Sequence, residues 1–336
     1  MFKYLIIFTI LSIIKVFYLK IAASKRIIDT PNHRSAHANP TIRGGGIIFI
    51  PAVILFILFF PVESQNFYFL IASILLVAVI SFIDDLVSLS TLKRILFHCI
   101  AFTLIFYDLN FFKYVSLISI SYIFLSYIFS LGYLNIYNFM DGINGITFLN
   151  ALVSYITFYI INTYIIEFTS SDLLLILIFS TLIFGFFNFR LKPVCFAGDV
   201  GSITIGFTII YFVIKLFLVT DSYIVFLILG VYLIDGGWTI SERVLRKENI
   251  FEAHRRHLYQ LYANELKIPH LKISFSYFMV QLVLNALVFC VLSSIILNSF
   301  TVGSLILLVL STIYYYIKKR VYKKINKLLN QNKQRI

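Results

Sequence analysis

The stretch NIYNFMDGINGI, residues 135–146, interrupts a sequence that is otherwise almost continuously apolar. Polar side chains are poorly tolerated in lipid, so this cluster is expected to face water, a cavity or a ligand. Asn138 and Asp141 are three residues apart and would share one face of a helical turn, where their oxygens could form half of a site for a hard cation. The alternative is a polar loop with Asp-Gly and Asn-Gly turns between two helices. The polar residues of the stretch that we single out are Asn135, Asn138, Asp141 and Asn144.

The composition of the whole chain indicates an integral membrane protein. Of its 336 residues, 60% are hydrophobic and only 13% are charged, whereas about 25% of the residues of a soluble domain are charged. The net charge of +13 is expected to record orientation and contact with anionic membrane lipids, and not binding of nucleic acid. The three cysteines show no CxxC spacing, so neither a disulfide framework nor a zinc site is predicted.

The apolar runs predict an all-α, polytopic membrane protein with about 11 transmembrane helices. A single transmembrane catalytic domain would occupy residues 1–317, followed by a basic cytoplasmic tail at 318–336. With the N-terminus outside and the C-terminus inside, only Lys3 and Lys113 among the loop lysines and arginines would face outward, which agrees with the positive-inside rule. The predicted spans are 2–23, 46–61, 67–83, 92–107, 114–133, 146–166, 173–189, 202–219, 223–240, 273–297 and 302–317.

The same map places a group of acidic residues at the inner ends of spans or in inner loops, and none at the middle of a span. Polar chemistry is therefore predicted at one face, the cytoplasmic one. The inner acids are Asp29, Asp84, Asp85, Asp141, Asp199 and Asp235.

The first inner loop, DTPNHRSAHANPTIRGGG at 29–46, ends in a glycine run that opens the next helix. Free backbone N–H groups in such a run can approach an anion, although a flexible linker is an equal alternative. The candidate anion-binding residues here are Arg34, His37, Arg43 and Gly45.

Two further inner segments supply carboxylates. Asp84 and Asp85 are neighbours on a helix and point about 100° apart, so we expect one to face the reaction centre and the other a structural or basic partner. Asp199, in FAGDVGS, lies at a predicted helix N-terminus, where a metal–phosphate group can approach. An ordinary N-cap is the alternative for Asp199.

The longest inner loop contains EAHRRHLYQ at 252–260. His254 and His257 are three residues apart and could be metal ligands. The adjacent Arg255 and Arg256 would repel a cation and suit a diphosphate instead.

Taken together, these segments resemble the polyprenyl-phosphate N-acetylhexosamine-1-phosphate transferases (glycosyltransferase family 4). DTPNHRSAHANPTIRGGG, the DDL at Asp84, NIYNFMDGINGI, FNF with FAGDVGS, and HRRHLYQ follow the family's order over most of the chain. The sequences FAGDVGS and HLYQ are similar to those of the branch that makes bacterial surface polysaccharides. Two departures are Ile42 in place of a common proline and a lysine that is either displaced to Lys192 or lost at Val194. A third is Tyr259 and Gln260 in place of histidines, which leaves the identity of the sugar open.

The resemblance implies transfer of an N-acetylamino-sugar-1-phosphate from a UDP-sugar to undecaprenyl phosphate, with release of UMP. The site would lie on the cytoplasmic face of the bacterial inner membrane, and a homodimer is compatible with the sequence. Asn138 and Asp199 would hold Mg²⁺, or Mn²⁺, and Asn144 would read the uracil edge. The catalytic candidates are Asp84, Asp85, Asp141, Arg255, Arg256 and His257. The substrate-binding candidates are Arg34, His37, Arg43, Gly45, Asn135, Asn144, Asn188, Lys192, His254, Tyr259 and Gln260.

Two other classes of function account for part of this pattern. A transporter or flippase of polyprenyl-linked sugars would need acids or broken helices at mid-membrane, whereas only Lys15 and Lys215 lie inside predicted spans. A non-catalytic scaffold with a lipid-binding tail would leave the inner carboxylates unexplained.

Overall fold

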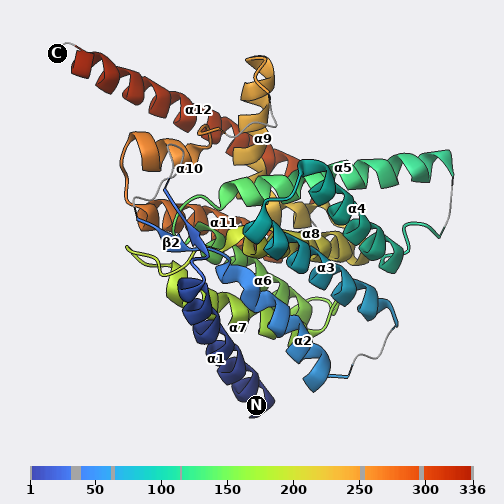
Figure 1. Ribbon diagram of the computed structural model, residues 1–336. Coiled ribbons are helices and arrows are strands. Elements are labelled where there is room, and N and C mark those ends of the chain that lie inside the picture. Colours follow the sequence, from blue (N-terminus) through green and yellow to red (C-terminus); the bar gives the residue numbers. More distant parts are fainter. Residues whose placement is uncertain are drawn as a thin grey trace.

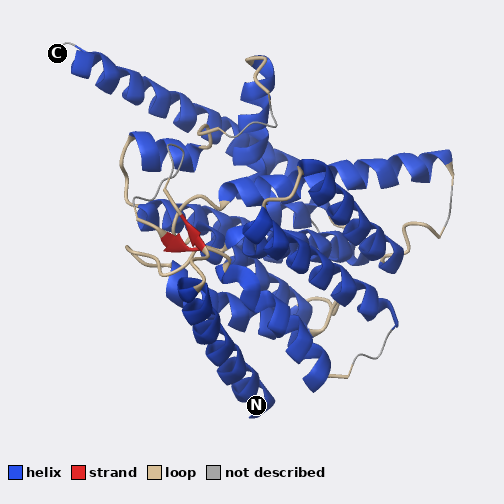
Figure 2. Ribbon diagram, viewed as in Figure 1, coloured by secondary structure: helices blue, strands red, loops and turns tan. Residues whose placement is uncertain are grey.

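The computed structural model describes residues 2–31, 39–61, 65–113, 116–249, 254–294 and 299–333 of the chain. Nearly all of this is helix, with one short antiparallel strand pair (Figures 1 and 2). The elements are α1 (Phe2–Ser24), β1 (Ile28–Asp29), β2 (Thr41–Ile42), η1 (Gly45–Ile48), α2 (Phe49–Phe59), α3 (Gln65–Val87), α4 (Thr91–Asp108), α5 (Leu117–Met140), α6 (Ile146–Tyr164), α7 (Ser171–Asn188), α8 (Gly198–Thr220), η2 (Tyr223–Leu229), α9 (Gly230–Leu245), α10 (Leu258–Gln260), η3 (Leu261–Glu265), α11 (His270–Leu292) and α12 (Ser299–Lys333).

The predicted all-α, polytopic membrane fold is confirmed. In the described part of the chain, nine helical segments are long and apolar enough to cross a membrane: α1, α3, α5 to α8, η2 with α9, α11 and α12. The other two predicted spans are also helical, as η1 with α2 and as α4. The count of 11 crossings and the N-out orientation remain predictions.

Three helices run further than the hydropathy pattern suggested. α5 ends at Met140, so Asn135 and Asn138 lie within this helix and not in the loop that follows the predicted span. α9 ends at Leu245, five residues beyond the predicted end of its span. α12 continues to Lys333, which makes the described part of the predicted tail an extension of the last span. Within that extension, the Nζ of Lys318 is buried 3.0 Å from the Glu242 carboxylate of α9.

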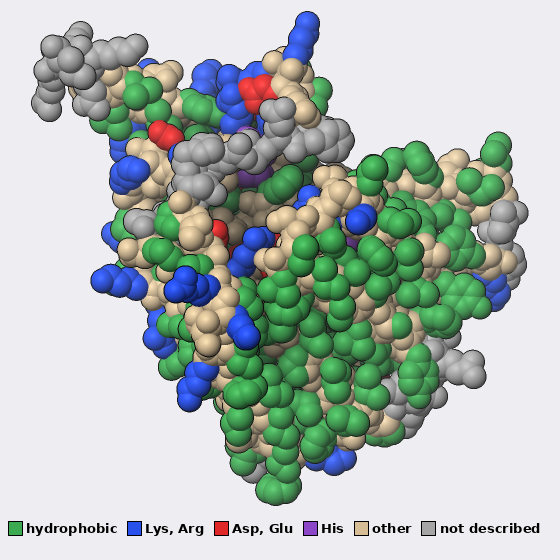
Figure 3. Space-filling view, viewed as in Figure 1, with side chains coloured by type: hydrophobic (Ala, Val, Ile, Leu, Met, Phe, Trp, Pro, Cys, Tyr) green, Lys and Arg blue, Asp and Glu red, His purple; other side chains and the backbone are tan. Residues whose placement is uncertain are grey.

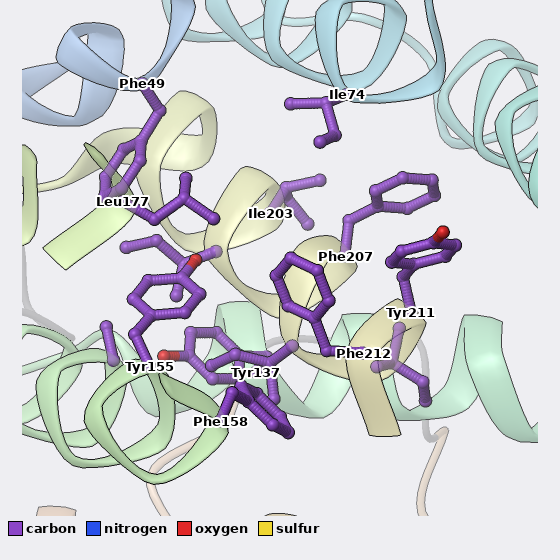
Figure 4. Close-up of a cluster of buried hydrophobic side chains, with 14 of the residues drawn as sticks. Phe49, Ile74, Tyr137, Tyr155, Phe158, Leu177, Ile203, Phe207, Tyr211 and Phe212 are labelled. Atoms are coloured by element: carbon purple, nitrogen blue, oxygen red, sulfur yellow. The ribbon is translucent and has the colours of Figure 1, made fainter. Parts of the chain in front are cut away.

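Helix α8 forms the centre of the bundle and packs against α3, α5, α6 and η1. Figure 4 shows its side chains Ile203, Phe207 and Phe212 among aromatic and aliphatic groups of the surrounding helices. Lipid is as apolar as leucine, so helices in a membrane are held by close packing more than by the hydrophobic effect. Gly206 of α8 illustrates this, because an added Cβ would come within 2.9 Å of the Tyr137 Cβ of α5.

The glycine run 44–46 serves packing and not anion binding. The N–H groups of Gly45 and Gly46 donate to the carbonyls of Phe196 (2.7 Å) and Ala197 (2.8 Å). A Cβ on Gly46 would lie 2.0 Å from the Gly201 Cα, so only glycine allows this contact with α8. The expectation that these N–H groups are free, and with it the assignment of Gly45 to substrate binding, is therefore wrong: the carbonyls of the segment before α8 already occupy them.

The helix ends fall into two groups at opposite ends of the bundle, as the alternating spans require. At one end, Asp85 of α3 contacts the start of α8, and Asn188 of α7 accepts from the Gly145 N–H just before α6. At the other, Tyr4 of α1 donates to Asp172 of α7, and Asp108 of α4 accepts from Tyr211 of α8. The two chain ends also lie far apart in Figure 1. These contacts agree with the predicted alternation of helix ends, whereas the number of crossings and the side that faces the cytoplasm remain predictions.

Candidate active site

A cavity of about 410 Å³ opens at the end of the bundle where the predicted inner segments meet. Figure 3 shows charged and histidine side chains gathered over the upper part of the molecule, above a mostly hydrophobic lower face. Apolar groups from α3, α4, α5, α8 and α9 line part of the cavity. Its polar lining consists of Ser81, Asp84, Thr91, Arg94, His98, Asn135, Asn138, Asp199, Arg243, His254 and His257.

Asp84 and Asp85 diverge at the end of α3, as expected for neighbours on a helix. Asp84 borders the cavity, and its Oδ2 lies 3.3 Å from Arg94 Nη1. Asp85 turns away and accepts the backbone N–H groups of Asp199 (2.9 Å) and Val200 (3.0 Å). Asp85 is therefore a cap of α8 that comes from a different helix. It accepts N–H groups that have no intrahelical partner at the start of a helix.

Because Asp85 caps α8, the side chain of Asp199 is not used as an N-cap. It lies in the first turn of α8, is 20% exposed and borders the cavity. Asn138, in the last turn of α5, also borders the cavity, and its Oδ1 accepts a hydrogen bond of 2.7 Å from Ser202 of α8. Two oxygen-bearing side chains from different helices are thus fixed on one wall.

Two arginines balance part of the negative charge. Arg43 lies 2.7 Å from Asp85 and 3.5 Å from Asp199, and Arg94 lies 3.3 Å from Asp84 and 4.0 Å from Asp199. Burial lowers the pKa of Arg43, but Asp85 and Asp199 outweigh it, so the pKa lies above its ordinary value and the group stays charged.

Asp141 follows α5 directly and accepts a 2.5 Å hydrogen bond from Thr147 of α6. Burial, with Asp199 and Asp85 nearby, raises its pKa to about 7, although Thr147 and Arg43 act in the opposite direction. Near neutral pH this carboxyl group therefore exchanges between its two protonation states.

The loop that begins at His254 contributes two histidines to the cavity. The Nδ1 of His257 lies 3.0 Å from Asp235 Oδ1, and its Nε2 has no hydrogen-bond partner within the described ranges. Burial and the neighbouring His257 lower the pKa of His254 to about 3, so His254 is neutral at physiological pH and does not supply charge to an anion.

The other candidates in this loop have protein partners. Arg256 pairs with Glu248 (Nη2–Oε1, 2.5 Å) and approaches Glu242 (3.5 Å). Tyr259 is fully buried and donates to the Phe139 carbonyl at 2.7 Å. Gln260 accepts the His257 N–H at 3.3 Å. None of these side chains, nor Arg255, is among the groups that line the cavity.

Several predicted residues lie outside the cavity. Asn188 joins the Gly145 N–H to the Cys195 carbonyl, and Asn144 donates to the Arg190 carbonyl at 3.0 Å, so both amides hold the α7–α8 connection in place. Lys192 is exposed. Arg34 and His37 lie outside the described residues.

The structure also brings forward residues that the sequence did not single out as site residues. Arg94 and His98 project one helical turn apart into the cavity from α4, a spacing of four that places them on one face. Arg243 reaches it from α9. Asp235, one of the inner acids to which the sequence assigned no role, is buried within α9.

The oxygen donors of the cavity would suit a magnesium ion bound together with a substrate phosphate. Asp84, Asp199 and Asn138 offer oxygen donors to one cavity. In the described part of the chain, no three His, Cys, Asp or Glu side chains converge closely enough to cage an ion. Mg²⁺ is commonly held by one or two carboxylates together with substrate phosphates, so this donor set suits it and does not call for a complete protein cage.

Residues 66–217, which contain Asp84, Asn138, Asp141 and Asp199, match glycosyl transferase family 4. The predicted resemblance is confirmed for this part of the chain, just under half of its length, which is similar to that family. Among curated proteins, the chain is similar to phospho-N-acetylmuramoyl-pentapeptide-transferases of Streptococcus pyogenes. That of serotype M18 (strain MGAS8232) is 29% identical over 225 residues, 59% of this chain and 66% of the relative. That of serotype M4 (strain MGAS10750) is 28% identical over 228 residues, with the same coverage. The match thus spans just under two-thirds of these relatives.

Proposed function

We propose that the protein transfers a sugar-1-phosphate from a UDP-sugar to undecaprenyl phosphate and releases UMP. The observation that carries the proposal is the meeting of Asp84, Asp199 and Asn138 on one cavity at an end of the bundle. A cavity at the end of a membrane-spanning bundle is accessible to a water-soluble donor, and it can also contact a lipid phosphate at the level of the headgroups. The match to glycosyl transferase family 4 supports this reaction class.

In this reaction, a phosphate oxygen of the lipid attacks the β-phosphorus of the donor, and the bond to the α-phosphate oxygen breaks as UMP leaves. A phosphate monoester has a second pKa of about 6 and is already mostly dianionic, so little base catalysis is needed. Positioning and charge stabilisation then carry most of the rate enhancement.

The residues divide this work. When bound, Mg²⁺ would supply positive charge at the donor diphosphate, with Asp199 and Asn138 as its protein ligands. Asp84 would lie towards the attacking phosphate, and Arg94 would orient it while balancing its charge. Asp85 holds α8, and therefore Asp199, in register. His257 Nε2 would contact a phosphate oxygen.

Two donors are distinguished by separate observations. The loop sequence HRRHLYQ favours a UDP-amino sugar such as UDP-GlcNAc and the initiation of a lipid-linked surface polysaccharide. The names of the streptococcal relatives favour a phospho-N-acetylmuramoyl-pentapeptide donor. We propose the amino sugar, with the bacterial inner membrane as the location and its cytoplasmic face as the site of reaction.

The test uses the full chain, purified in detergent, with undecaprenyl phosphate, Mg²⁺ and a panel of UDP-sugars that includes UDP-N-acetylmuramoyl-pentapeptide. UMP release and the mass of the lipid product are measured. Release with one or more amino sugars supports the proposal, and release with the muramoyl pentapeptide alone assigns the second donor. If no donor yields UMP or a lipid product, the proposed reaction is wrong, and uptake of polyprenyl-linked sugars into liposomes becomes the assay for the transporter alternative.

A further inference from the structure

Asp235 has the most heavily hydrogen-bonded carboxylate near the cavity, and the reaction above gives it no role. It is 1% exposed within α9, and its side chain accepts hydrogen bonds from three other parts of the chain. The donors to its two oxygens are Tyr277 Oη of α11 (2.6 Å), Tyr314 Oη of α12 (2.9 Å), His257 Nδ1 (3.0 Å), the Leu258 N–H (3.2 Å) and Thr239 Oγ1 (3.3 Å).

This arrangement determines which nitrogen His257 presents to the cavity. An ionised carboxylate only accepts hydrogen bonds, so the ring nitrogen that faces Asp235, Nδ1, carries a proton. Nε2 is then the atom left for a ligand. His257 is 2% exposed and lines the cavity, yet Nε2 has no hydrogen-bond partner within the described ranges. A buried polar atom left unpaired is unfavourable, and a ligand in the cavity would offset this cost.

The plane of the His257 ring is also held. Tyr259 stacks on it with ring centroids 5.8 Å apart and an interplanar angle of 24°, and His254 lies on it at 4.9 Å. The Tyr259 hydroxyl is in turn hydrogen-bonded to the Phe139 carbonyl at the end of α5. The position, tautomer and ring plane of His257 are therefore fixed by Asp235, Tyr259 and His254. Of these three residues, His254 alone lines the cavity.

We propose that Asp235 is a positioning residue for the transfer reaction. It would hold the His257 Nδ1–H so that Nε2 meets a phosphate oxygen in the cavity, and it would tie this geometry to α11 and α12 through Tyr277 and Tyr314. The inference rests on the proposed function. In this contact the ring carries both protons: Nδ1–H donates to Asp235 and Nε2–H donates to the phosphate oxygen, and no covalent bond is made or broken at the ring.

The test is a mutant cycle on the full chain, with kcat and KM followed by UMP release. His257→Ala and Asp235→Ala should each lower kcat by about a hundredfold, with a smaller change in KM. The double variant should be no slower than His257→Ala alone, because Asp235 acts through the ring that is already absent. Asp235→Asn should recover activity to within about tenfold of the wild type, because its amide oxygen can still accept the Nδ1–H proton.

Asp235→Ala leaves several buried donors without an acceptor, so Asp235→Asn provides a second cycle with His257→Ala should the alanine variant not fold. Asp235→Asn/His257→Ala should then equal His257→Ala in kcat. Tyr314→Phe is the matched control: it removes one donor to the same carboxylate but leaves the histidine contact, and kcat should stay within about threefold of the wild type.

The outcomes separate this inference from the proposed function. Multiplicative losses in either cycle, or an Asp235 variant that changes only the melting temperature, overturn the positioning role in an active enzyme. A wild type that is inert with every donor overturns the proposed function, and the inference with it.

Discussion

Both ends of the helical bundle bury carboxylates, but they use them differently. At the end opposite the candidate site, Asp108 accepts from Tyr211 and shares a cavity of about 300 Å³ with one cation, Lys215. At the site end, the carboxylates of Asp84, Asp85, Asp141 and Asp199 lie near two arginines of the described residues, Arg43 and Arg94.

The two ends of the bundle therefore differ in how far their own cations balance their carboxylates. One acid beside one base is a balanced pair that requires nothing more. Four carboxylates beside two arginines leave an excess of negative charge within this group. Burial first, and then the charges of Asp199 and Asp85, raise the pKa of Asp141 to about 7. A cation that enters together with the diphosphate would offset this negative charge, in agreement with the proposed magnesium complex.

The comparison of the two ends is tested most directly by their accessibility. We expect a cysteine at Asn249 to be protected from an impermeant thiol reagent in intact cells, and a cysteine at Glu167 to be labelled completely, because the positive-inside rule places the site end inside. Cys99 and Cys290 are replaced beforehand, while the buried Cys195 is retained. Labelling at Asn249 from outside would invert the map and remove the cytoplasmic site.

The largest catalytic effect is expected for Asp199→Asn, which should lower kcat by about a thousandfold while the protein remains folded in the membrane. The amide keeps the shape but lacks the charge that a metal–diphosphate complex needs. EDTA should abolish wild-type activity, and added Mg²⁺ should restore it. Asp221→Asn is the matched control, because Asp221 is exposed at the opposite end and should be silent. Near-normal turnover of Asp199→Asn would show that the metal assignment is wrong.

The sequence predicts that Arg256 clamps the diphosphate, whereas the structure pairs it with Glu248 outside the cavity lining. A role as a clamp predicts that Arg256→Ala lowers activity by about a hundredfold with every UDP-sugar alike, since the charge that an arginine meets on a diphosphate does not depend on the sugar. Arg256 pairs with Glu248 in the structure, which supplies a comparison. Glu248→Gln should have a much smaller effect if Arg256 contacts the diphosphate. Equal losses in the two variants would instead assign Arg256 to holding the loop.

Asp141→Asn is expected to stabilise the protein at high pH. The pKa of Asp141 is raised from its ordinary value near 3.8 to about 7, first by burial. Between these values the folded state keeps a proton that the unfolded chain has lost, so this contribution to stability is full below about pH 4 and is lost as the pH rises through 7. The asparagine avoids this loss.

The expected gain at pH 8 is about 2–4 kcal/mol, because each pKa unit of the shift corresponds to about 1.4 kcal/mol. It should disappear near pH 4, and melting curves of both proteins across this range measure it. A difference that does not change with pH would mean that Asp141 is already ionised in the folded state.

The carboxylate cluster could be predicted from sequence because it depends on two local rules. Apolar runs locate the helix ends, and their alternation places Asp84, Asn138 and Asp199 on one side. The glycine run 44–46 could not be interpreted in this way, because its N–H partners lie about 150 residues further along the chain, at Phe196 and Ala197. Asp235 was overlooked for a similar reason: its donors come from three segments that the sequence does not bring together.

Tyr259 gives the smallest expected effect and separates the two interpretations of its loop. The sequence suggested that Tyr259 and Gln260 read the sugar, in which case losing a hydrogen bond would shift the ratio between donors about ten- to a hundredfold. The structure favours another outcome, since the hydroxyl is buried on the Phe139 carbonyl and the ring supports His257. Tyr259→Phe keeps the ring and removes one hydrogen bond, so we expect a loss of about 1 kcal/mol in stability. Activity should fall at most a few-fold, and evenly across the donor panel. Tyr259→Ala, which also removes the stacking on His257, should lower kcat further but still evenly. A change in donor preference in Tyr259→Phe would return the loop to the sugar-binding site and show that substrate binding rearranges it.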